Sequence, residues 1–249
     1  MIPPVATDFV IRSCDTLAEL KACVELQRQV WGYSDADLVP VPILIVACKT
    51  GGHVLGAFDD DRLVGFTLGF AAHRSGTPYV HSHFLAVLPD YRDRGVGRAL
   101  KLQQREHCLR HGVHSIEWTF DPLEIKNARL NIVRLGSIVR KFIPNLYGVT
   151  SSRLHGDLPT DRLVAEWRID SPRVTAALAG NAPPSAAAAV RIALPVEIAQ
   201  MRQDDPAAAR AIQSNLRREF EHYFSRGYAV TGFHIAAPNA TYLLEPYED

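Results

Sequence analysis

A short run of residues near the middle of the chain has the composition of a phosphate-binding turn. It consists of Arg92, Asp93, Arg94, Gly95, Val96, Gly97 and Arg98. Gly95 and Gly97 allow the backbone to come close to a ligand and to adopt positive φ. A segment with helical spacing follows, and the first amides of a helix, together with its dipole, attract anions. We therefore expect this segment, with its three arginines, to bind a pyrophosphate group.

Other phosphate motifs fit this segment less well. A dinucleotide fingerprint needs a third glycine, where this chain has Leu100. A P-loop needs glycine followed by lysine and then serine or threonine, and this combination does not occur in the sequence. A glycine-rich turn that only joins a strand to a helix stays open as the alternative.

Two histidines directly before this segment could act as bases. His81 and His83 lie two apart on an expected strand, so both side chains should share one face. A neutral imidazole can take up a proton near pH 7. Glu117, on a second expected strand, is a further candidate. The alternative is that these are polar groups beside the sheet without a catalytic role, and no additional ligands suggest a metal site.

Four polar residues further along the chain could bind substrate or cofactor. Asp121 could bind a positively charged group of a substrate, or it could cap the helix expected from Leu123. Asn127 and Asn131 lie four apart on one expected helix face, where Asn127 could contact a cofactor and Asn131 a substrate. Arg162 could hold a carboxylate through two hydrogen bonds. A solvated helix face for the asparagines and a surface ion pair for Arg162 are the structural alternatives.

The pattern of apolar residues predicts the elements that must position these groups. Strands are expected at 9–12, 54–58, 63–71, 79–88, 115–120 and 163–169, and helices at 17–32, 42–48, 97–111 and 123–135. Thr16 and Glu19 form a capping box at the start of the first helix. For 42–48 a strand is the alternative, because that segment is so apolar.

The composition changes after residue 170. Residues 171–190 contain three prolines and many alanines, which predicts a linker between a domain at 1–170 and a C-terminal α/β extension at 191–249. The extension should contain strands at 190–194, 228–235 and 241–244 and a helix at 206–226. We expect it to pack on the sheet of the first domain or to extend that sheet.

The overall composition is that of a globular protein. Hydrophobic residues make up 47% and charged residues 22% of the 249 residues, and 27 Lys and Arg balance 27 Asp and Glu. No sequence-wide basic field predicts binding to nucleic acid or to a membrane surface. The four cysteines are scattered, which favours free thiols in a reducing compartment. Without a signal peptide or a spanning segment, we expect a cytoplasmic protein.

The segment from His83 to Leu100 resembles motif A of the GNAT acyltransferase superfamily. The specific part is Val87-Leu88-Pro89, followed by Tyr91-Arg92 and the two glycines. The stretch from Trp118 to Gly148 resembles a poorly characterised branch of that superfamily. The resemblance implies a GNAT fold, which is α/β with a mixed central sheet flanked by helices.

This resemblance also implies an activity. The cofactor would be acetyl-coenzyme A or another acyl-coenzyme A such as succinyl-coenzyme A, with its pyrophosphate on the amides between Arg92 and Arg98. Its pantetheine arm would pair with the backbone of Leu85, Ala86 and Val87. The acyl group would pass directly to a small amine or amino acid. A protein N-acetyltransferase and a non-catalytic acyl-coenzyme A-binding module are the alternatives, and a homodimer is possible by analogy.

One position departs from the family pattern. Members usually have a tyrosine that protonates the leaving thiolate, four residues before the glycine that closes the last helix, and this chain has Ile132 there. Tyr147 could replace this acid, or water could. If Tyr147 has no such role, it is expected to serve in packing.

Overall fold

A computed structural model of the chain describes residues 9–148, 158–181 and 189–248. The described residues fall into two compact units, with Glu117 the last residue of the first and Trp118 the first residue of the second. Each unit is described by itself below. The domain boundaries expected at 170 and 190 stay predictions.

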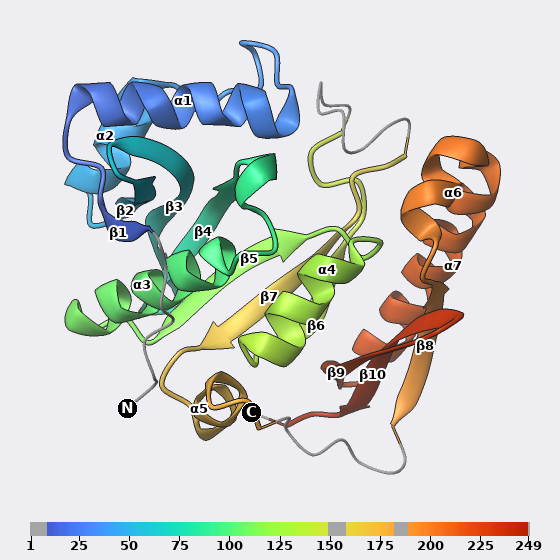
Figure 1. The fold of residues 1–249 in the computed structure, drawn as a ribbon. Coiled ribbons are helices and arrows are strands. Elements are labelled where there is room, and N and C mark those ends of the chain that lie inside the picture. The colour runs from blue at the N-terminus through green and yellow to red at the C-terminus, as the bar shows by residue number, and fades with distance from the viewer. Residues whose placement is uncertain (1–8, 149–157, 182–188, 249) are drawn as a thin grey trace. The chain divides into compact units, whose positions relative to one another are not determined.

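The first unit is built on a sheet flanked by helices (Figure 1). Its strands in spatial order are β1 (Val10–Ser13), β2 (His53–Asp59), β3 (Arg62–Arg74), β4 (Thr77–Val87) and the beginning of β5 (Ser115–Phe120). Its helices are α1 (Leu17–Trp31), α2 (Val41–Lys49), the short 3-10 helix η1 (Pro89–Tyr91) and α3 (Val96–Arg110). The pairs from β1 to β4 are antiparallel, and β4 pairs with β5 in parallel.

The two faces of this sheet carry different helices. Phe66 of β3 lies 6.2 Å from the Phe84 ring, which lies 4.8 Å from Trp31 of α1. The next residue, Thr67, lies within hydrogen-bond distance of Gln104 of α3. Because neighbouring side chains of a strand point to opposite faces, α1 covers one face and α3 the other.

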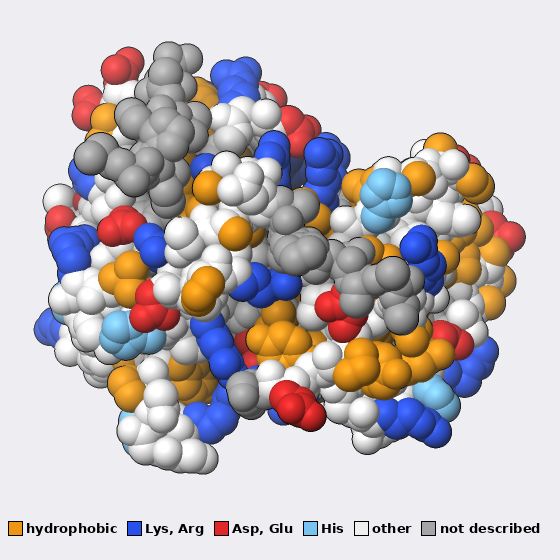
Figure 2. Space-filling view, turned by 90° about the horizontal axis from the view of Figure 1, so that it is seen from below, with side chains coloured by type: hydrophobic (Ala, Val, Ile, Leu, Met, Phe, Trp, Pro, Cys, Tyr) orange, Lys and Arg blue, Asp and Glu red, His pale blue; other side chains and the backbone are white. Residues whose placement is uncertain are grey.

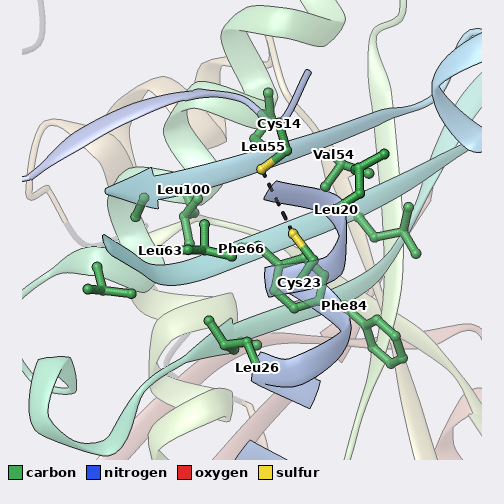
Figure 3. Packing of buried hydrophobic residues seen from close by; sticks show 14 of the residues in the cluster. Cys14, Leu20, Cys23, Leu26, Val54, Leu55, Leu63, Phe66, Phe84 and Leu100 are labelled. Atoms are coloured by element: carbon green, nitrogen blue, oxygen red, sulfur yellow. Dashed lines mark hydrogen bonds between the residues drawn. The ribbon is translucent and has the colours of Figure 1, made fainter. Parts of the chain in front are cut away.

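The predicted capping box at the start of α1 is confirmed. Thr16 Oγ1 accepts a hydrogen bond from the Glu19 amide at 3.2 Å, and Glu19 Oε2 accepts one from the Thr16 amide at 2.9 Å. Behind this cap, the apolar face of α1 packs on the sheet, and Figure 3 shows Cys23 with its thiol directed at Cys14. Their sulfurs are 3.8 Å apart, and all four cysteines are free thiols, as expected.

The second unit contains the rest of β5 and a second set of strands. Their order is β7 (Arg162–Arg168), β6 (Ile138–Ile143), β9 (Tyr228–Ala236), β10 (Asn239–Pro246) and β8 (Val190–Pro195). The helices are α4 (Ile125–Ala128), the π-helix η2 (Arg129–Arg134), α5 (Pro172–Leu178), α6 (Ile198–Asp204) and α7 (Pro206–Phe224). Val139 of β6 pairs with Val230 of β9, so the residues after 190 continue the sheet of this unit.

Several elements differ from the sequence-based prediction. The segment 42–48 is a helix, as first expected, but 123–135 is a short α-helix that passes into a π-helix. β6 and α6 were not predicted, and α5 occupies the first part of the expected linker. Pro172 stands in the first turn of α5, where its missing amide proton is not needed, and Ser171 caps the helix. The mixed α/β architecture with flanking helices is confirmed.

Candidate functional site

The expected anion-binding segment joins β4 to α3. Gly95 caps α3 with a φ of 84°, and its cap contributes no side-chain hydrogen bond to the first helical amides. Asp93 also has a positive φ, 61°. Among the described residues, none lies within 4 Å of the place that a Cβ at Gly95 would take. The helix start therefore presents its amides on an open, exposed turn, as an anion site requires.

Two arginines of this segment, Arg92 and Arg94, make contacts that hold their side chains in place. Arg92 Nε donates a hydrogen bond to the Val87 carbonyl at 3.3 Å. The Arg94 guanidinium lies over the Tyr91 ring, 5.1 Å from its centroid, and the Tyr91 hydroxyl donates to Asp59. Arg92 and Arg94 are exposed and Arg98 is partly buried. A phosphate at the turn would thus meet the guanidinium groups of Arg92 and Arg94, whose side chains are already ordered by these contacts.

β4 changes its partners close to this turn. In its ladder with β3, Phe84 faces Leu68 and Ser82 faces Gly69, so His83 is an extra residue and forms a β-bulge. On the other side, the described pairs between β4 and β5 are only two, Val80 with Ile116 and His81 with Glu117. Within the described residues of the first unit, the pairing of β4 with β5 thus ends at His81 and Glu117, and the edge of β4 continues beyond it. This edge contains Leu85, Ala86 and Val87, the residues expected to pair with pantetheine.

The two histidines come together as expected, on the face of β4 that also carries the Phe70 contact. Their ring centroids are 6.1 Å apart, and His83 lies 5.6 Å from the Phe70 ring. Burial, and then the neighbouring His81, lower the pKa of His83 to about 4. Burial also lowers the pKa of His81, but the nearby Glu117 carboxylate opposes that shift. Both rings are therefore neutral at pH 7, and His83 binds a proton more weakly than an ordinary histidine.

Glu117 is already engaged in an ion pair. Arg74 donates to its two carboxylate oxygens at 2.5 and 2.9 Å, and the Glu117 side chain is only 12% exposed. Both carboxylate oxygens are thus occupied by the guanidinium, so a substrate group would have to compete with Arg74 for them. The sequence offered no sign of this pair, because the two residues lie 43 positions apart.

In the second unit, Tyr147 lies beside Arg162. The Arg162 guanidinium carbon is 5.3 Å from the centroid of the Tyr147 ring. The Tyr147 hydroxyl is 3.0 Å from Thr119 Oγ1 on β5, and the Tyr147 amide donates to Thr160 Oγ1 at 2.9 Å. The ring is 43% exposed. Two predicted site residues, one from each of two separate segments, are thus brought together.

Asp121 makes two contacts at the end of β5. Its Oδ1 accepts a hydrogen bond from the Leu123 amide at 2.8 Å in the turn before α4, whereas the N-cap of α4 is Glu124, so Asp121 does not cap that helix as expected. Its Oδ2 lies 2.5 Å from Arg202 of α6, which also binds Glu124 at 2.8 Å. Arg202 was not identified from the sequence, where it is one of two charged residues on a short helix that was not predicted.

The asparagines and Ile132 differ from expectation. Asn127 is exposed on α4 whereas Asn131 is 4% exposed, so the two do not share one environment. The reason is the change from α-helix to π-helix at Arg129, which alters the angular spacing of side chains. Ile132, at the position of the family tyrosine, is fully buried.

The described residues offer neither a cluster of metal ligands nor a membrane-spanning helix. No group of three or more His, Cys, Asp or Glu in the described part is arranged to hold a metal ion. Among these same residues, no helix is both long and apolar enough for a membrane span. On the face shown in Figure 2, Lys and Arg side chains lie interspersed with Asp and Glu, in keeping with the balanced composition.

Part of the chain matches a known protein family. Residues 20–130 match the model of the acetyltransferase (GNAT) family. This range includes β4, the anion-binding turn and α3. A comparison with curated proteins finds no match.

Solved structures share the fold at low identity. The ribosomal-protein-S18-alanine N-acetyltransferase from Escherichia coli is 16% identical with a TM-score of 0.52, covering 66% of this chain and 95% of that one. The putative acetyltransferase yncA from Salmonella typhimurium, solved with its cofactor acetyl-CoA, is 18% identical with a TM-score of 0.53, covering 66% and 96%. The aminoglycoside 6'-acetyltransferase type Ii is 19% identical with a TM-score of 0.50, covering 65% and 98%.

The family match and the shared fold define the class of protein. Residues 20–130 match the GNAT acetyltransferase family, and the resemblance inferred from the motif around Gly95 is confirmed. It is therefore an enzyme of the acyltransferase class. The similar structures act on acceptors of very different kinds, so the class does not specify the acceptor of this chain.

Proposed function

We propose that this protein transfers an acyl group, acetyl or succinyl, from coenzyme A directly to the amine of a small molecule or amino acid. The observation that carries the proposal is the combination of an open helix start at Gly95 with the β4 edge that continues past His81, the last β4 residue paired with β5 within the first unit. The first feature can bind a pyrophosphate, and the second can pair with the amides of a pantetheine arm.

The acyl transfer itself needs a neutral amine. The amine nitrogen attacks the thioester carbonyl, the carbon–sulfur bond breaks, and the thiolate leaves with the electron pair. An alkyl ammonium with a pKa of about 10.4 costs roughly 4–5 kcal/mol to deprotonate at pH 7, whereas an α-ammonium with a pKa near 8 costs about 1.4 kcal/mol. Since His83 binds protons weakly, the site is better suited to an amine that gives up its proton easily.

His81 and His83 are the proposed proton acceptors. Burial lowers the pKa of His81, and the Glu117 carboxylate opposes that effect by favouring the protonated ring. His83 stands at the bulge, where side chains are commonly re-aimed toward a site. Tyr147 is the proposed donor to the leaving thiolate, with water as the alternative.

Arg162 supports an amino acid as the acceptor. Its guanidinium lies against the Tyr147 ring, and an arginine can bind a carboxylate through two parallel hydrogen bonds. Asp121 and Asn131 are further proposed acceptor contacts, and Asn127 a proposed cofactor contact. A protein N-terminus as acceptor and a binding module without catalysis are the rival functions. Homodimer formation and a cytoplasmic location stay predictions.

A thiol-release assay separates these possibilities. The purified protein is incubated with acetyl-CoA or succinyl-CoA and a panel of amino acids, polyamines and short peptides, and free thiol and acylated product are measured. Product with amino acids supports the proposal, and product with peptides alone supports the protein-directed rival. Tight coenzyme A binding without thiol release from any pair would support the binding module.

The cofactor assignment has its own variant. Gly97→Glu places a carboxylate at the helix start and should weaken coenzyme A binding by tenfold or more, measured by calorimetry. Gly97→Ala is the matched control, because an added Cβ would lie 3.7 Å from Leu85 and 3.9 Å from Val87, in ordinary contact. Equal affinities of wild type and Gly97→Glu would show that the phosphates bind elsewhere.

A further inference from the structure

A buried polar network lies on the α3 side of β4, and the proposed chemistry does not use it. Its members are between 0% and 4% exposed and are His53, Thr67, Ser82, Lys101 and Gln104. Lys101 Nζ donates to Ser82 Oγ at 2.7 Å and to Gln104 Oε1 at 3.1 Å. Gln104 Nε2 lies 2.8 Å from His53 Nε2 and 3.4 Å from Thr67 Oγ1. The network thus joins α3 to three strands.

The network is attached to β4 on both sides of the bulge. Thr67 Oγ1 donates to the Phe84 carbonyl at 2.7 Å, immediately after His83. Ser82, immediately before His83, accepts from Lys101. A bulge interrupts the regular ladder, and a buried carbonyl there needs a donor from elsewhere. Thr67 supplies that donor, so the course of β4 past His83 depends on a side chain and not on the ladder alone.

The surrounding backbone makes room for these polar groups. A Cβ at Gly69 would lie 2.5 Å from two atoms of the His53 ring, so only glycine accommodates the imidazole in its place. Burying a lysine is unfavourable, and apolar residues would fill the same volume at lower cost. Burial lowers the pKa of Lys101 to about 7. A network with this cost is more readily explained by a geometric task than by stability.

We propose that Thr67 is a positioning residue for acyl transfer: supported by Gln104 and Lys101, its hydroxyl holds the Phe84 carbonyl and sets the direction of β4 beyond His83. This inference rests on the proposed function, because the backbone from Leu85 to Val87 is the proposed binding edge for pantetheine. A shift of that backbone would move the thioester relative to the amine. Thr67 is 0% exposed, so it would act through its hydrogen bond to β4 and not by direct contact with a substrate.

Thr67→Val tests the proposal, since it removes the hydroxyl and keeps the branched shape. Thr67→Ser is the matched control, because it keeps the hydroxyl and loses only a methyl group. We expect Thr67→Val to lower kcat by roughly 10- to 100-fold, as small misplacements of reacting groups do. It should also raise the KM for acyl-CoA and increase amide hydrogen exchange at Leu85 to Val87. Thr67→Ser should restore all three quantities to near the wild-type values.

A merely structural role of Thr67 predicts a different result. Thr67→Val would then lower the Tm, while kcat and the exchange of the β4 amides would match the wild type, and this outcome overturns the proposal. If Thr67→Val does not fold, Gln104→Leu takes its place, and unchanged kcat in that variant overturns the proposal in the same way.

If the proposed function itself is wrong, the measurements give a different result from a failure of the positioning role alone. A wild-type protein that binds no coenzyme A and releases no thiol would refute the acyltransferase assignment. Amide exchange needs no turnover, so it still decides whether Thr67 holds β4. Unchanged exchange in Thr67→Val would then overturn the positioning role as well.

Discussion

Lys101 makes the stability of this protein depend on pH in a way that can be measured. Its side chain is 1% exposed, and burial lowers its pKa from an ordinary 10.5 to about 7. In the unfolded chain the lysine keeps its proton up to pH values near 10.5. Replacing it in Lys101→Met removes the titrating group and leaves a side chain of similar length.

The sign and size of the effect follow from proton linkage. Between pH 7 and 10.5 the unfolded state binds more protons than the folded state, so this group makes the folded protein more stable as pH rises. Below pH 7 the full burial penalty applies, about 5 kcal/mol for a pKa difference of this size. Between pH 6 and pH 9 the penalty falls by roughly 2–3 kcal/mol. Relative to wild type, Lys101→Met should therefore be stabilised most at pH 6, and this advantage should shrink by roughly 2–3 kcal/mol by pH 9.

Urea unfolding of both proteins at several pH values between 6 and 9 measures the difference. The methionine also leaves Ser82 and Gln104 without a donor, but that cost is the same at every pH, so the slope is the test. Lys21→Met, at an exposed position of α1, is the control for replacing a helical lysine. A free-energy difference between Lys101→Met and wild type that stays constant within about 0.5 kcal/mol from pH 6 to 9 would refute the reasoning.

Two further substitutions test the packing around the site. Gly69→Ala should destabilise the protein by about 1–3 kcal/mol through overpacking against His53, and His53→Ala in the same chain should relieve part of that cost, as a double-mutant cycle in urea would show. Arg202→Met should cost roughly 3 kcal/mol because it leaves the Asp121 carboxylate buried without its cation, with Arg202→Lys as the milder control. Equal unfolding midpoints for wild type and Arg202→Met would mean that water already compensates Asp121 and Glu124.

Local signals explain which elements could be predicted from the sequence. The capping box at Thr16, the strand–turn–helix around Gly95 and the alternation along β4 depend on residues close in the chain, and each agrees with the structure. β6 was missed because Arg140 and Lys141 interrupt its apolar pattern. α5 was missed because Pro172 suggested a linker, whereas in the first turn of a helix proline is favourable.

The site shows the same division between local and distant interactions. The anion-binding turn could be recognised from seven consecutive residues. The ion pair of Glu117 with Arg74 and that of Asp121 with Arg202 join residues 43 and 81 positions apart. Lys101 and Gln104 could have been noticed, because they lie on the same helical stripe as the buried Leu100 and Cys108. A polar residue on a core-facing stripe indicates a buried network when no external partner explains it.

The distribution of the four thiols makes the first unit convenient for kinetic measurement. Cys48 is exposed, whereas Cys14, Cys23 and Cys108 are at most 3% exposed. A thiol reagent should modify Cys48 at once and the three others only when the core around α1 and α3 opens. The rate of the slow phase at high reagent concentration then equals the opening rate. The opening rate of the first unit can thus be measured through its native cysteines, without introducing a new labelling site.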